Sequence, residues 1–170
     1  IQDGVINPSL SNVAGASVNG AAVANAIAAV SAKKPSNKIE LALYQKVGIG
    51  SGQGASNPWL QELPDPVTRA TWDNYIIMSP AMARTILKID LNNAGQADAY
   101  EVQPPKQVVK VTVDGKSIEL PVLIIPGTHP QTVGIALGYG RAEAIGKSVI
   151  GTGKNAFPLA CIENGLVQFA

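Results

Sequence analysis

The chain has 170 residues, enough to close one hydrophobic core, so we expect one domain with a small N-terminal addition. Only 15% of the residues are charged, against about 25% in an average soluble domain, which indicates that much of the surface contacts other protein. The net charge of +1 argues against a nucleic-acid binder, and the single cysteine, Cys161, excludes an internal disulfide and any cluster of cysteine ligands.

The N-terminal part of the chain predicts a helix followed by a linker. Alanine, valine and isoleucine recur at helical spacing over residues 19–32. Polar residues interrupt this stretch, so we expect no transmembrane segment, and residues 1–10 show no export signal. The run KKPSN at residues 33–37 is typical of a linker. We therefore expect a helical extension over residues 1–36 and a second domain over residues 37–170.

A strand and a glycine-rich loop are predicted next. Residues 39–47 (IELALYQKV) alternate apolar and other side chains, which predicts a buried strand. Residues 48–56 (GIGSGQGAS) contain four glycines, and such a loop could cradle a phosphate only if a helix followed at once. Asn57 and Pro58 follow instead, so a flexible loop is the favoured interpretation and a phosphate site the weaker one.

The rest of the chain predicts short strands with few helices. Ser79 and Pro80 match the cap and first position of a short helix, whereas residues 95–107 have the character of an irregular loop. Asp114 and Gly115 form a strong hairpin signal between two β-rich runs. The predicted strands are residues 108–113, 117–125 and 132–137, with short closing strands at 157–159 and 165–169. This pattern predicts a compact barrel that is mainly β with short helices.

The sequence contains few residues suited to catalysis. The one histidine, His129, lies in a predicted turn, where a surface role is the common one, so a hydrolase that pairs it with Cys161 is a weak hypothesis. Glu62 and Asp73 could form a glycosidase pair, but Glu62 lies in a proline-bounded turn where carboxylates commonly accept backbone hydrogen bonds. The acidic residues are scattered singly, so no metal site is expected.

Residues 57–80 (NPWLQELPDPVTRATWDNYIIMSP) hold both tryptophans and four of the prolines. Trp59, Trp72 and Tyr75 could stack on a ligand ring, although large aromatics beside prolines more often pack at the edge of a core. From the residues alone, packing is the favoured interpretation.

Residues 57–80 resemble the run that opens the C-terminal domain of molybdopterin oxidoreductases of the polysulfide-reductase type. The resemblance continues in order with LPVLIIPGTHPQTVGIALGYGRA at residues 120–142 and GTGKNAFPL at residues 151–159. It is greatest to the fused molybdopterin-like and iron-sulfur subunit of alternative complex III, a quinol:cytochrome c oxidoreductase. The resemblance covers residues 39–160 and implies a double-psi β-barrel, as in molybdopterin dinucleotide-binding domains.

The resemblance also implies a set of cofactor-binding residues. In active enzymes of this kind, Arg141 would pair with a diphosphate, Asn155 would bond a guanine or pterin edge, and the glycines would let backbone approach closely. The other interpretation is that the same residues brace the barrel. The residues concerned are Trp72, Asp73, Asn74, Gly138, Tyr139, Gly140, Arg141 and Asn155.

For function, the resemblance implies a segment of a larger subunit in a respiratory electron-transfer complex. The alternative complex III subunit resembles a molybdopterin protein without its cofactor, so we expect a structural and docking domain with no complete active site and no cofactor. The alternative is a domain that binds molybdopterin guanine dinucleotide in an active molybdenum oxidoreductase. Iron-sulfur clusters would lie elsewhere in the parent protein. The expected partners are other domains of the parent, membrane subunits and cytochrome subunits, at the periplasmic face of the inner membrane.

Overall fold

A computed structural model describes residues 18–32, 38–102, 106–142, 149–163 and 166–168. The chain divides into two compact units, Ile1–Pro35 and Ser36–Ala170. In the first unit the described element is helix α1 (Gly20–Ala32), which confirms the predicted helix. The predicted linker at residues 33–37 lies outside the described residues. No helix in the described part of the chain is both long and apolar enough to cross a membrane.

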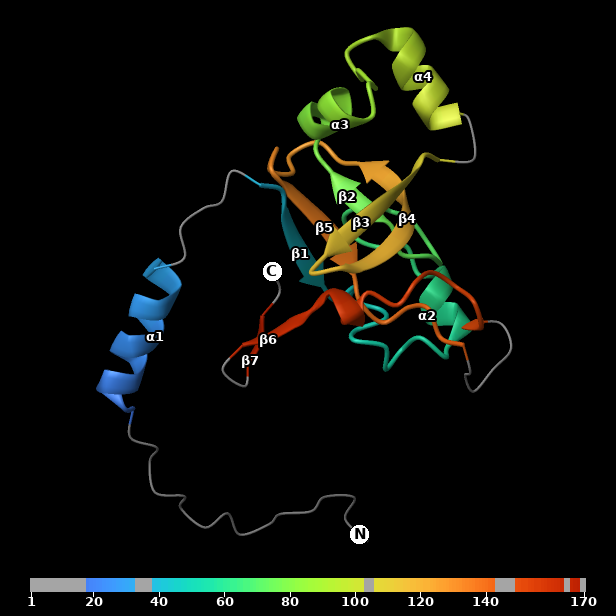
Figure 1. The fold of residues 1–170 in the computed structure, drawn as a ribbon. Helices are drawn as coiled ribbons and strands as arrows, with labels where there is room; N and C mark the ends of the chain where they lie inside the picture. Colours follow the sequence, from blue (N-terminus) through green and yellow to red (C-terminus); the bar gives the residue numbers. More distant parts are fainter. Residues whose placement is uncertain (1–17, 33–37, 103–105, 143–148, 164–165, 169–170) are drawn as a thin grey trace, which may run out of the picture. The chain divides into compact units, whose positions relative to one another are not determined.

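The second unit is built on one curled, five-stranded mixed sheet (Figure 1). Its strands are β1 (Glu40–Tyr44), β2 (Ile76–Met78), β3 (Val108–Val113), β4 (Lys116–Ile124) and β5 (Thr132–Ala136). They lie in the order β1-β5-β2-β4-β3. β1 pairs with β5 and β2 with β4 in parallel, whereas β2 and β5, and β3 and β4, are antiparallel. The curled sheet with short helices agrees with the predicted mainly β fold.

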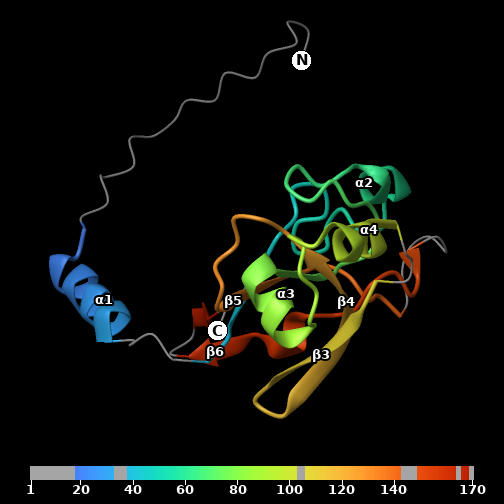
Figure 2. The ribbon, with the colours of Figure 1, turned by 90° about the horizontal axis from the view of Figure 1, so that it is seen from above.

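The β3–β4 hairpin confirms the prediction from Asp114 and Gly115. Both residues have positive φ, 49° and 77°, which is the conformation that a two-residue type I′ turn requires. The strands pair from Val108 with Pro121 to Val113 with Lys116. Figure 2 shows this hairpin as a long ribbon whose turn projects away from α2 (Pro58–Glu62).

Alternation along the strands gives the sheet one buried and one open face. Leu41 and Leu43 of β1 are buried, while Tyr44 points to the opposite side and is half-buried. The buried face packs against apolar residues of helix α3 (Pro80–Ile86) and of the short 3₁₀ helix η2 (Phe157–Leu159). The open face over β1, β5 and β2 carries the cavity described below.

Several short elements differ from the prediction. The predicted loop at residues 95–107 is wrong, because helix α4 (Ala94–Val102) forms there, with the Asn93 side chain accepting a hydrogen bond from the Gln96 amide at 3.2 Å. The predicted strand at 157–159 is also wrong. It is η2, since Pro158 has no N–H for a strand ladder. A small hairpin joins β6 (Cys161–Glu163) and β7 (Leu166–Gln168), the second of which falls within the predicted strand at 165–169.

Candidate functional site

Asn74 is the central polar residue of the region that the resemblance marks for a cofactor. Its side chain is fully buried, at 0% exposure. Its Nδ2 donates hydrogen bonds to the carbonyl oxygens of Ala136 and Lys154, both at 2.9 Å, and its Oδ1 accepts one from the Lys154 amide at 2.8 Å. The carboxamide therefore bonds both the backbone N–H and the backbone C=O of Lys154, and it joins the end of β5 to the loop around Lys154.

The residues beside Asn74 make further contacts within the chain. The Asp73 side chain accepts a hydrogen bond from the Gly153 amide at 2.7 Å. The Trp72 amide donates to the Gln61 carbonyl at 2.8 Å, and Trp72 itself has a positive φ of 61°. Trp72, Asp73 and Asn74 thus tie the start of β2 to α2 on one side and to the loop around Gly153 on the other.

The glycines of the GYGR segment approach other parts of this chain closely. A Cβ added at Gly138 would lie 2.7 Å from the Gly52 nitrogen, and one at Gly140 would lie 2.1 Å from the Asn155 nitrogen. The resemblance implied that these two glycines let backbone approach a cofactor closely, whereas in the structure they lie close to the glycine-rich loop and to Asn155. The space against each glycine is therefore filled by the chain itself.

Arg141 and Asn155 lie on the surface, and both side chains contact the backbone of this chain. Nη2 of Arg141 donates to the Gly52 carbonyl oxygen at 2.5 Å. Oδ1 of Asn155 accepts from the Phe157 amide at 3.1 Å, at the start of η2. Together with Tyr139, which is buried against Ile49, these residues complete the predicted set. Four polar side chains of the set, those of Asp73, Asn74, Arg141 and Asn155, each bond the backbone of this chain.

Sequence reasoning missed Lys46, a buried lysine in the middle of this region. Only 6% of it is exposed. Its Nζ donates to the Asp73 carbonyl oxygen at 3.2 Å and lies 4.3 Å from the centre of the Tyr75 ring and 5.1 Å from that of Tyr139. Burial lowers the pKa of Lys46 to about 8, against the opposing influence of Asp65 and Asp73. No local motif marks this lysine, because its burial depends on chain segments far away in sequence.

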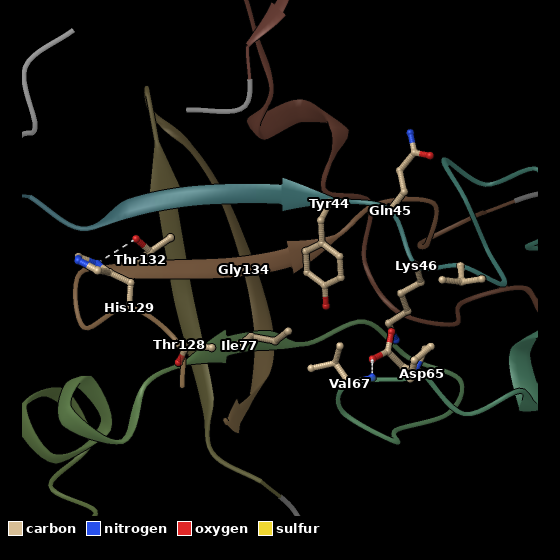
Figure 3. A pocket seen from close by; sticks show the side chains of 12 residues that line it. Tyr44, Gln45, Lys46, Asp65, Val67, Ile77, Thr128, His129, Thr132 and Gly134 are labelled. Carbon is tan, nitrogen blue, oxygen red and sulfur yellow. Dashed lines mark hydrogen bonds between the residues drawn. The ribbon is translucent and has the colours of Figure 1, made fainter. Parts of the chain in front are cut away.

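A cavity of about 450 Å³ opens beside Lys46 on the open face of the sheet (Figure 3). Its floor includes Tyr44, Ile77 and Gly134, from the three strands β1, β2 and β5. Burial raises the pKa of Tyr44 above its usual range. The cavity is large enough for a small molecule.

His129 lies at the edge of the same cavity and shows no catalytic arrangement in the described residues. It is exposed, and its Nδ1 is 3.2 Å from the Gln131 amide and 3.3 Å from the Thr132 hydroxyl. The Cys161 side chain, its proposed partner in a hydrolase, lies outside the described part of the structure. Across the described residues, no three His, Cys, Asp or Glu side chains gather as a metal site.

No protein-family model matches the chain, and no curated protein matches its sequence.

We expect Lys46 to make the stability of the domain depend on pH between about 8 and 10. Its pKa is lower in the folded chain than in the unfolded chain, so the unfolded state binds more protons in this range and the free energy of unfolding rises with pH, by about 2 kcal/mol. Above pH 10 the raised pKa values of Tyr44 and Tyr139 act in the opposite direction.

Urea denaturation at several pH values, on the wild type and on Lys46→Met, measures this effect. The methionine keeps an unbranched apolar stem and removes the amine. The rise in stability between pH 8 and 10 should be absent from the variant. An equal rise in both proteins would show that Lys46 is not its source.

Proposed function

We propose that this chain is the C-terminal double-psi β-barrel domain of a molybdopterin oxidoreductase-like subunit, with a structural and docking role in a respiratory electron-transfer complex. The observation that carries the structural role is the Asn74 carboxamide, which is buried and makes three hydrogen bonds with the backbone at Ala136 and Lys154. A cofactor-binding amide would need a free donor or acceptor facing the ligand. In this interpretation the motifs that bind a dinucleotide in active enzymes brace the barrel instead.

An exposed apolar surface on α2 supports the docking role. Trp59 is 82% exposed and Leu63, which follows it by one helical turn at the C-terminal cap, is 54% exposed. Residues four positions apart lie on the same side of a helix, so the two side chains form one apolar stripe. Large exposed aromatics are unusual on a surface that meets only water and are frequent at interfaces. We assign this stripe to contacts with another domain of the parent subunit, which would sit with its membrane and cytochrome partners at the periplasmic face of the inner membrane.

The alternative function is a dinucleotide-binding domain in an active molybdenum oxidoreductase. One observation favours it. Arg141 and Asn155 are exposed, so a guanidinium and an amide would be accessible to a phosphate and a base edge.

Substitution of Trp59 by glutamate tests the docking role. In cells that produce the full parent subunit, Trp59→Glu should lower the yield of assembled complex about tenfold or more, because a buried interfacial tryptophan commonly contributes 2 kcal/mol or more to binding. Val108→Glu on β3 is the matched control, since Val108 is also an exposed apolar residue, at 60%. Native electrophoresis of solubilised membranes measures assembly.

Wild-type assembly with Trp59→Glu would contradict the assignment of this surface. The circular dichroism of the free chain should be unchanged in both variants, because neither side chain is buried.

A further inference from the structure

The cavity on the open face of the sheet has walls suited to a small apolar ring. Most of its twelve lining residues expose carbon atoms to the cavity. Figure 3 shows the Tyr44 ring lying across β5 at Gly134 and pointing toward Ile77 and Val67. A Cβ added at Gly134 would lie 3.4 Å from Cε1 of Tyr44, so the glycine lets this ring lie against β5. The floor of the cavity is therefore flat and apolar, and its position on three paired strands makes it rigid.

The Tyr44 hydroxyl is the polar group that this cavity leaves unused. It is buried and has no hydrogen-bond partner within the described structure. Buried hydroxyl groups are nearly always paired, so an unpaired one at a cavity indicates a missing partner. A tyrosine hydroxyl keeps its proton at neutral pH, and burial raises the pKa of Tyr44 further, so this group can donate a hydrogen bond to an acceptor.

The charges around the cavity favour a neutral ligand. Among the lining residues, all of which are described, Lys46 and Asp65 carry opposite charges. Lys46 is occupied with the Asp73 carbonyl and the Tyr75 ring, and Asp65 accepts hydrogen bonds from the Val67 and Thr68 amides. The two opposite charges cancel, which favours a neutral ligand over an ion.

We propose that this cavity binds a small neutral ring compound that carries a carbonyl group, with the ring between Val67 and Ile77 and the carbonyl oxygen accepting a hydrogen bond from Tyr44. This site borders the network around Asn74 at Lys46, and its occupation does not depend on the proposed role in a larger complex.

Titration with two ring compounds of the same shape tests the proposal. The probes are 2-acetylnaphthalene, which has a carbonyl, and 2-ethylnaphthalene, which has none. Amide chemical shifts of the ¹⁵N-labelled chain report the affinity and the location of binding. The ketone should bind the wild type about tenfold more tightly than the hydrocarbon, with shifts at Tyr44, Ile77 and Gly134. In Tyr44→Phe the two compounds should bind equally, because the ring remains and the donor is gone.

Two further variants locate the site. Val67 is 74% exposed at the wall of the cavity, so Val67→Trp should fill the space without disturbing the fold and abolish binding of both compounds. Val108→Trp, on a strand that does not line the cavity, should bind as the wild type does. Equal affinity of the wild type for the two compounds, an unchanged preference in Tyr44→Phe, tighter binding of 2-naphthoate than of the ketone, or no binding by the folded chain would each overturn the proposal.

Discussion

Replacement of Asn74 by alanine is expected to lower the free energy of unfolding by about 4 kcal/mol. The substitution removes three hydrogen bonds at once and leaves the Ala136 carbonyl and the backbone N–H and C=O of Lys154 without their partner. Asn74 is fully buried, so water cannot replace the carboxamide at low cost. Urea denaturation followed by circular dichroism measures the loss.

The control for this prediction is Asn155→Ala, at another asparagine of the set expected to bind a cofactor. Asn155 is exposed and bonds only the Phe157 amide among the described residues, so its loss should cost about 1 kcal/mol or less. If Asn74→Ala does not fold, Asn74→Asp at acidic pH keeps the acceptor for the Lys154 amide and, with its carboxyl group protonated, one donor for the two carbonyl oxygens, so it should retain part of the stability. Equal effects of Asn74→Ala and Asn155→Ala would contradict the bracing role.

Replacement of Gly140 by alanine should lower the free energy of unfolding by about 3 kcal/mol or more. Its Cβ would lie 2.1 Å from the Asn155 nitrogen and 2.5 Å from the Lys154 carbonyl carbon, so backbone would have to move. The positive φ of 75° adds the ordinary strain of a side chain in the left-handed region. Thermal and urea denaturation together measure the change.

Gly151→Ala separates these two contributions. Gly151 has nearly the same φ, 77°, but no described atom lies within 4 Å of an added Cβ. Gly151→Ala should therefore lower the free energy of unfolding by about 1 kcal/mol, from backbone strain alone. Similar losses in the two variants would mean that the close contact at Gly140 does not matter.

The sequence correctly predicted the elements whose turn or helix cap is formed by neighbouring residues. Asp114 and Gly115 predicted the β3–β4 hairpin because few residue pairs adopt two positive φ angles so readily. Ser79 and Pro80 predicted the start of α3, and the Ser79 hydroxyl does accept a hydrogen bond from the Met82 amide. In both cases the stabilising contacts lie within a few residues.

Two helices carried the same kind of signal and were missed. Asn57 and Pro58 start α2 just as Ser79 and Pro80 start α3, with the Asn57 side chain accepting from the Trp59 amide. Asn93 caps α4, but Gly95 made the segment resemble a loop. Helices of 5 and 9 residues have too few turns to show a periodic apolar face.

The candidate site could be predicted as a set of residues but not as a set of contacts. Asp73, Asn74 and Gly140 were singled out by their motifs, and they do meet around the loop at Gly153. The hydrogen-bond partners are separated by as many as 80 residues in the sequence, and the spacing of motifs does not predict which groups pair. Tyr44 was missed for the same reason, since its cavity forms only when β1, β2 and β5 align.

The most direct test of the structural role is metal and pterin analysis of the intact parent complex, purified in its assembled form. Elemental analysis for molybdenum and tungsten and fluorescence of the oxidised pterin should both give far less than one equivalent per complex. About one equivalent of metal and of pterin in the assembled complex would contradict the structural role and establish the alternative, a working dinucleotide-binding domain.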